Sequence, residues 1–225
     1  MEKHHGLLIV NEGPDGSGKE VQTGLLCTRL QAAGFTVRRF DFPTYGKDPV
    51  ADGIRFLLRY AKDEWNALPW KSKALLFAAN HQRFASEIAG ACETKGVVVC
   101  NRFVPSNQAH MAGYAVDDAE WKRRFTWIAK LEYEMLSIPR PDIVLLHTVS
   151  EEVRAELLKA REQGGLDAHE ENAEYLSRVS HAYHLLSQLN PDAWRHVPAD
   201  VDGRLQSPQK VHERVWTALT THPAW

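Results

Sequence analysis

The sequence has few cysteines, and their positions exclude two classes of protein. Its 225 residues include three cysteines, Cys27, Cys92 and Cys100. Their spacings form no metal-binding pattern, and an odd number of thiols cannot all pair as disulfides. We therefore expect neither a cysteine metal site nor a disulfide framework, and a reducing compartment is favoured.

The sequence also lacks a strong net charge and a long hydrophobic segment. A formal charge of −2 gives no electrostatic reason to expect nucleic acid or an anionic membrane as a partner. Residues 1–10 contain no apolar stretch long enough for a signal peptide or a membrane span. We therefore expect a cytoplasmic protein with no nucleic-acid partner and no membrane partner. An organellar location stays open, because a targeting segment could precede this sequence.

No internal repeat, low-complexity tract or linker interrupts the chain, in which short apolar runs alternate with amphipathic stretches. Strands are predicted over residues 7–10, 35–42, 97–100, 143–146 and 194–197. Helices are predicted over about residues 25–33, 70–94, 121–136, 151–161, 170–189 and 208–219. Continuous apolar strands separated by helices are typical of a parallel sheet covered on both faces. We therefore expect one doubly wound α/β domain over residues 1–225.

The most informative segment is Gly13-Pro14-Asp15-Gly16-Ser17-Gly18-Lys19, which follows the first predicted strand and opens a helix. Glycines let the backbone wrap around phosphate oxygens, and a helix N-terminus adds partial positive charge. This placement favours a phosphate-binding loop over a tight turn with a surface lysine, and Lys19 would reach the β and γ phosphates. The expected nucleotide contacts are Gly13, Gly16, Ser17, Gly18, Lys19, Glu20 and Val21.

The residue after the lysine departs from the usual motif. A Ser or Thr hydroxyl normally binds Mg²⁺ there, whereas this chain has Glu20, followed by Val21. A carboxylate can itself bind Mg²⁺, which makes Glu20 a candidate metal ligand. It can equally repel a bound triphosphate, and the sequence leaves both interpretations open.

Several further segments, taken in order, extend the pattern along nearly the whole chain. They are residues 10–19 with Gln22, the Phe-Pro segment 41–46, residues 75–80, residues 101–110, Pro141-Asp142, Arg161 and residues 167–170. Together they resemble the motifs of the thymidylate kinase family. The resemblance implies a three-layer αβα P-loop kinase fold with a five-stranded parallel sheet and a lid around residues 157–170. It also implies ATP- and Mg²⁺-dependent phosphorylation of dTMP to dTDP, and a homodimer.

The resemblance assigns roles to particular side chains. Lys19 would orient the donor, Arg102 and Arg161 would neutralise the transferring phosphoryl group, and Asp15 would position the acceptor sugar. An ordinary surface ion pair remains the alternative for each arginine. The implied acceptor site consists of Asp15, Phe42, Pro43, Tyr45, Phe77, His81, Arg102, Ser106, Asn107 and His110. For Phe77 the alternative is simple core packing.

Some positions depart from the family pattern. His81 stands where the family usually has an arginine that contacts the base, Asn101 replaces an expected aspartate, and Thr44 replaces a frequent arginine. Histidine 81 offers one donor and one acceptor in place of a fixed fork of donors. Two other functions therefore stay open: a kinase for another nucleoside monophosphate, and a catalytically impaired nucleotide-binding protein of the same fold.

Overall fold

A five-stranded parallel sheet forms the centre of the computed structural model, which describes residues 6–94, 96–160, 167–169 and 171–225. The strands lie in the order β2-β3-β1-β4-β5. They are β1 (Leu7–Glu12), β2 (Val37–Asp41), β3 (Val97–Asn101), β4 (Ile143–Thr148) and β5 (Trp194–Pro198). Each coincides with a predicted strand, so the expected α/β fold with a five-stranded parallel sheet is confirmed.

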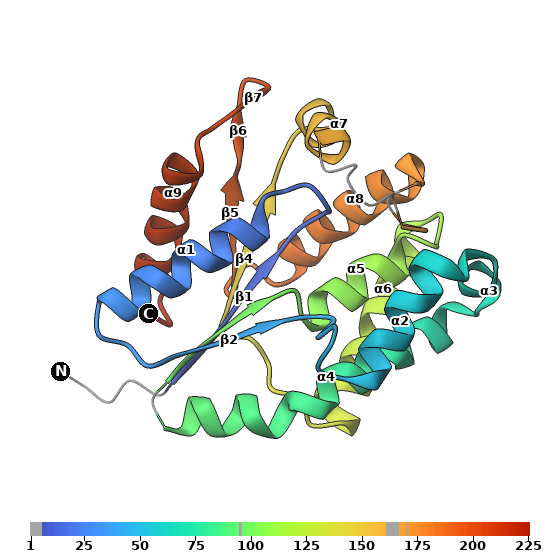
Figure 1. The fold of residues 1–225 in the computed structure, drawn as a ribbon, viewed down its shortest axis with the longest axis horizontal. Coiled ribbons are helices and arrows are strands. Elements are labelled where there is room, and N and C mark those ends of the chain that lie inside the picture. Colours follow the sequence, from blue (N-terminus) through green and yellow to red (C-terminus); the bar gives the residue numbers. More distant parts are fainter. Residues whose placement is uncertain (1–5, 95, 161–166, 170) are drawn as a thin grey trace.

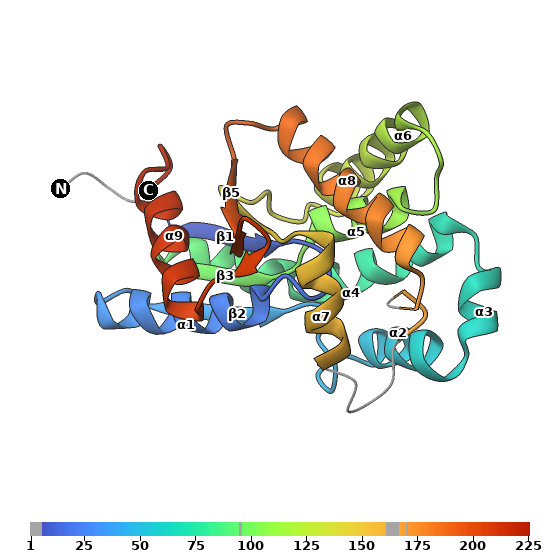
Figure 2. The ribbon, with the colours of Figure 1, turned by 90° about the horizontal axis from the view of Figure 1, so that it is seen from above.

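Helices cover both faces of this sheet, and Figures 1 and 2 show the resulting three layers. Helices α1 (Lys19–Ala32) and α9 (Pro208–Thr220) pack on one face. The other face is covered by α4 (Trp70–Glu93), α5 (Val104–Ala112) and α8 (Ala173–Leu189). Since both faces are buried at the centre of the sheet, β1, β3 and β4 need apolar residues in succession, which explains their continuous hydrophobic runs.

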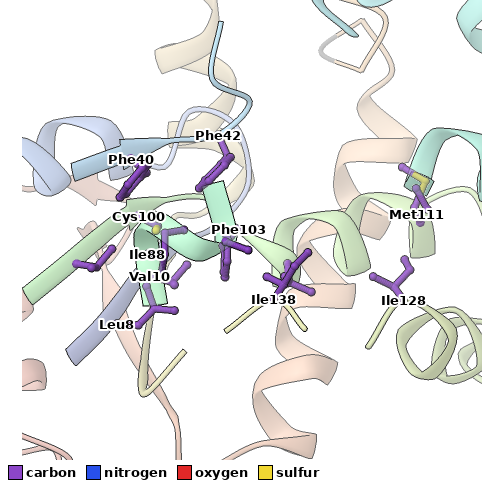
Figure 3. Close-up of a cluster of buried hydrophobic side chains, with 14 residues drawn as sticks. Leu8, Val10, Phe40, Phe42, Ile88, Cys100, Phe103, Met111, Ile128 and Ile138 are labelled. Atoms are coloured by element: carbon purple, nitrogen blue, oxygen red, sulfur yellow. The ribbon is translucent and has the colours of Figure 1, made fainter. Parts of the chain in front are cut away.

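Strand β1 illustrates how the layers are held together. Leu8 and Val10 face the core cluster beneath α4 and α5, where they lie with Ile88 and Phe103 (Figure 3). Ile9 points to the opposite face and packs with apolar side chains of α1 and α9. Alternating contacts on both faces fix β1 at the centre of the sheet, and with it the loop that follows.

Some elements differ from the prediction in their bounds or type. The helix expected over residues 121–136 is α6 (Asp118–Ala129) continued by a π-helix, η1 (Lys130–Met135). Helix α8 begins at Ala173 because Asn172 accepts a hydrogen bond from the backbone N–H of Tyr175. Helix α7 spans Glu151–Ala160, and residue 161, where the predicted helix ends, lies outside the described residues. Strand β2 is shorter than the predicted segment 35–42.

Two helices and one hairpin were not predicted. Helices α2 (Pro49–Tyr60) and α3 (Lys62–Ala67) lie together at the right of both views. A small hairpin is formed by β6 (Asp200–Val201) and β7 (Arg204–Leu205). Across the part of the chain that the structure describes, no helix is long and apolar enough to cross a membrane.

Candidate functional site

A pocket of ≈ 620 Å³ opens where the loops after β1 and β3 meet. Strand β1 pairs with β3 on one side and with β4 on the other, so the loops following these strands diverge at the carboxyl edge of the sheet. In parallel α/β sheets ligands bind at this kind of position. The pocket is lined by residues of the predicted phosphate loop and by side chains from α4 and α5.

The phosphate loop has the backbone that its glycines predicted. Gly13, Gly16 and Gly18 have φ angles of 146°, 82° and 77°. A Cβ atom on Gly13 would lie 2.4 Å from the carbonyl oxygen of His147, so no larger residue fits there. Gly18 is the N-cap of α1, which places the helix N-terminus against the pocket. The loop therefore has the geometry of an anion-binding site.

Lys19 and Arg102 converge on Asp15. The Lys19 ammonium donates to the Pro14 carbonyl oxygen over 3.1 Å and lies 3.7 Å from Asp15 Oδ1. Arg102 Nη2 donates to the same carboxylate oxygen over 2.5 Å, and its Nη1 donates to Ser106 Oγ over 2.9 Å. Burial alone would raise the pKa of Asp15, but Arg102 and Lys19 outweigh burial and hold this pKa far below its usual value. Asp15 is therefore ionised and holds two cationic side chains together.

Arg102 follows β3 directly and has a φ of 65°, in the left-handed region that non-glycine residues rarely adopt. Its backbone N–H donates to the Asn11 carbonyl oxygen over 2.9 Å. The neighbouring Asn101 side chain donates to Asp41 over 3.2 Å instead of contacting the arginine. Asp15, which comes from the other loop, thus supplies the carboxylate that anchors Arg102.

Glu12 is a buried site residue that the sequence analysis did not single out. Its Oε1 accepts from the backbone N–H groups of Phe103 and Ser106 over 2.8 and 3.1 Å, at the start of α5. Its Oε2 accepts from the Tyr183 hydroxyl over 2.9 Å. Burial raises the pKa of Glu12 to about 7, against the opposing effect of Arg102. The side chain ties β1 to the first turn of α5 and so fixes the loop that carries Arg102.

The Phe-Pro segment and α4 form the apolar end of the pocket. Phe42, Pro43, Phe77 and His81 all line it. Phe77 also packs edge-on against Trp65, with ring centroids 6.0 Å apart, so it serves both core and pocket. Tyr45, predicted as part of the acceptor site, lines the pocket and is exposed.

Thr44, whose position is frequently an arginine in the family that the sequence resembles, is turned away from this pocket. Its Oγ1 accepts from Asn80 Nδ2 over 2.7 Å, and its backbone N–H donates to Asn80 Oδ1 over 3.2 Å. The same amide nitrogen donates to Asp48 over 2.7 Å, which joins the Phe-Pro segment to α4 and to the start of α2. The threonine therefore fixes the shape of the segment.

His110 is a buried neutral side chain beside Arg102. Its Nε2 lies 3.2 Å from Arg102 Nη1, and its Nδ1 lies 2.9 Å from the Tyr175 hydroxyl. Since that hydroxyl donates to the His110 carbonyl oxygen, Nδ1 carries the proton and Nε2 accepts from the arginine. Burial and then Arg102 hold the pKa of His110 well below its usual value. The ring stacks on His169, 5.1 Å away, whose pKa burial lowers to about 3.

The structure brings most of the predicted site residues to one pocket. Those lining it are Asp15, Gly16, Gly18, Lys19, Glu20, Val21, Phe42, Pro43, Tyr45, Phe77, His81, Arg102, Ser106, Asn107 and His110. Gly13 and Ser17 are buried within the loop and do not line the pocket. Arg161 and most of the segment that follows it lie outside the described residues. Lining residues outside the predicted site are Arg39, Asp41, Leu58, Arg59, Asn101, Phe103, Leu157, Asp167 and His169.

A phosphate loop, a lysine inside it, and an arginine from the adjacent strand end all line one pocket. A sheet of this topology with such a site defines a P-loop nucleotide kinase.

Comparison with known proteins narrows this class. Residues 11–210 match the thymidylate kinase family. Curated relatives include the thymidylate kinase of Mycobacterium tuberculosis strain H37Rv, 33% identical over 88% of this chain and 95% of the relative. That of Thermomicrobium roseum is 30% identical over 94% of this chain and 93% of the relative. The chain belongs to the thymidylate kinase family.

Solved structures support the fold. Thymidylate kinase from Candida albicans superimposes with a TM-score of 0.76 at 19% identity, over 99% of this chain and 95% of the other. The enzyme from Ehrlichia chaffeensis gives a TM-score of 0.68 at 21% identity, over 95% of this chain and 98% of the other. The three-layer αβα architecture predicted from the sequence is thus shared with solved members of this family.

Proposed function

We propose that the protein transfers the γ-phosphoryl group of ATP to dTMP, giving ADP and dTDP. Family membership supports this reaction. The observation that carries it is the convergence of Lys19 and Arg102 on Asp15, at the mouth of a pocket lined by Phe77 and His81. One end of that pocket suits an anion and the other suits a planar apolar base.

The chemistry needs positive charge more than a base. In phosphoryl transfer the transition state spreads negative charge over the equatorial oxygens. Lys19 binds the donor phosphates, and Arg102 neutralises the charge of the transferring phosphoryl group. Asp15 holds both side chains in position for these roles. The acceptor is a phosphate that is already anionic, so no side chain has to remove a proton from it. The expected contact of Asp15 with the acceptor sugar stays a prediction.

Mg²⁺ fits the side chains of this site. Within the residues that the structure describes, no three acidic, histidine or cysteine side chains gather to hold a metal. Mg²⁺ does not need a cluster of three protein ligands, because it is commonly held by one or two carboxylates together with substrate phosphates and water. The exposed carboxylate of Glu20 lines the pocket beside Lys19 and would be that ligand. The ion would neutralise charge on the phosphates.

The role of Glu20 gives the first prediction. We expect Glu20→Thr to raise the Mg²⁺ concentration needed for half-maximal rate about tenfold, since a hydroxyl is a weaker ligand than a carboxylate. Titrating Mg²⁺ at saturating ATP and dTMP measures this. Glu213→Thr on exposed α9, whose carboxylate pairs with Arg29, is the control. A faster Glu20→Thr enzyme at every Mg²⁺ concentration would show that Glu20 only repels the triphosphate.

The remaining assignments are part of the proposal. Residues 1–225 form one kinase domain, residues 157–170 act as its lid, and Arg161 contributes from that lid. The protein works as a cytoplasmic homodimer. The lid prediction is supported by Leu157, Asp167 and His169, which line the pocket on either side of Arg161 in the sequence.

The proposed reaction is tested by an ADP-release assay with ATP, Mg²⁺ and a panel of monophosphates. The panel is dTMP, dUMP, UMP, CMP, dCMP, AMP and GMP. We expect dTMP to give the highest kcat/KM. If another monophosphate is preferred, we would assign the change in substrate specificity to His81, which lines the base end of the pocket. Silence across the panel with ATP still bound would identify a nucleotide-binding protein without turnover.

A further inference from the structure

A buried carboxylate lies directly behind the base end of the pocket. Glu132 is fully buried on η1. Its Oε2 lies 2.6 Å from His81 Nδ1, and its Oε1 accepts from Asn107 Nδ2 over 2.7 Å. Both partners line the pocket, one from α4 and the other from α5. Glu132 does not line the pocket, so it can act on a ligand only through these two side chains.

Glu132 fixes the orientation of the Asn107 amide. The Asn107 nitrogen donates one hydrogen to Glu132 and the other to the Ala74 carbonyl oxygen, 3.0 Å away. Two acceptors around the nitrogen leave no choice of orientation for the amide. Its oxygen Oδ1 is buried and has no hydrogen-bond partner among the described residues. Asn107 therefore offers an unused acceptor, which an N–H group of a ligand can satisfy.

Glu132 also determines what His81 offers. The imidazole ring lies among the rings of Phe42 and Phe103, with centroids 4.9 and 5.1 Å away. The contact with Glu132 occupies Nδ1, which leaves Nε2 as the ring nitrogen for a ligand. When the pair carries one proton between Nδ1 and Oε2 and a second on Nε2, His81 offers an Nε2–H donor, whichever partner holds the first proton.

We propose that Glu132 is the positioning residue that sets the hydrogen-bond polarity of the base pocket. It makes Asn107 an acceptor and His81 a donor. This pattern matches a base edge that carries a ring N–H next to a carbonyl oxygen, as in a 4-oxopyrimidine. Cytosine presents a ring nitrogen acceptor and an amino donor, so it mismatches both side chains. The inference rests on the proposed kinase function and explains how histidine at position 81 still serves such a base.

The test compares two substitutions of Glu132 that differ in hydrogen bonding. In Glu132→Gln the carbonyl oxygen still accepts from Asn107, while the new amino group donates to His81 Nδ1. His81 then keeps its proton on Nε2, and the ratio of kcat/KM for dTMP to that for dCMP should stay within about threefold of the original. In Glu132→Met neither bond exists, and we expect this ratio to fall about tenfold or more, mainly through a higher KM for dTMP.

Glu134→Met, on the exposed side of η1, is the matched control and should leave the ratio unchanged. Thermal unfolding of each variant shows whether it folds. Equal loss of selectivity in Glu132→Gln and Glu132→Met would overturn the proposal, because it would show that only the charge or the packing matters. An unchanged ratio in Glu132→Met would overturn it as well.

A second measurement does not depend on turnover. In NMR spectra of the full chain with ¹⁵N-labelled histidine, the His81 signal is identified by its loss in His81→Gln. We expect a protonated Nε2 at neutral pH in the original protein and in Glu132→Gln. An unprotonated Nε2 would refute the assigned polarity even if the enzyme is active. If no monophosphate reacts, the kinase proposal fails, while this spectrum still tests the effect of Glu132.

Discussion

Replacing Arg102 by methionine is expected to lower kcat by about 10³-fold or more, the effect typical of an arginine that neutralises a transferring phosphoryl group. The guanidinium lies 2.5 Å from Asp15 and 2.9 Å from Ser106, so its position is fixed before substrate binds. Position 102 has a left-handed φ of 65°. Methionine and arginine both have a Cβ atom, so the free-energy cost of this backbone conformation is the same in the variant. Steady-state kinetics with both substrates saturating measures the loss.

Two further variants separate charge from geometry. Arg102→Lys keeps a cation near Asp15 but loses the planar fork of donors, so its kcat should fall between those of methionine and arginine. Arg83→Met removes an exposed arginine of α4 that does not line the pocket and should leave kcat unchanged. A kcat for Arg102→Met within tenfold of the original would exclude Arg102 from the transfer step.

The phosphate loop could be predicted from the sequence because its chemistry is local. Gly13, Gly16 and Gly18 are needed for positive φ angles within one short loop, and Lys19 follows them directly. Strands β1, β3 and β4 were predictable for a similar reason, since burial on both faces requires consecutive apolar residues. Helix α2 was missed although it begins at Pro49 and buries Ala51, Ile54 and Leu58 at helical spacing, a periodic signal that the sequence analysis did not use.

The supporting carboxylates could not be predicted from spacing. Glu12 contacts Phe103 across 91 positions of sequence, and Glu132 contacts His81 across 51. Neither pair has a periodic signature, because the contact exists only once the sheet and helices have packed. The signal that was available is chemical: an acidic residue at the end of a buried strand, such as Glu12, requires a partner.

The buried carboxyl group of Glu12 is expected to make the free energy of unfolding depend on pH. Burial raises the pKa of its carboxyl group from 4.5 to about 7 in the folded protein. The folded chain therefore binds this proton more tightly than the unfolded chain does. The resulting stabilisation is fully present below pH 4.5 and is lost as the pH rises through about 7. A shift of this size corresponds to about 3 kcal/mol of unfolding free energy.

Glu12→Gln should remove this dependence. A glutamine oxygen can accept from the N–H groups of Phe103 and Ser106, and its amino group can donate to the Tyr183 hydroxyl. Urea unfolding measures the free energy of unfolding of both proteins. The value for the variant minus the value for the original protein should rise by about 2–3 kcal/mol between pH 5 and pH 8. Histidine titrations occur in both proteins and cancel in this difference. A difference that stays constant with pH would show that Glu12 is ionised throughout, and that Arg102 and the α5 N-terminus fully compensate for its burial.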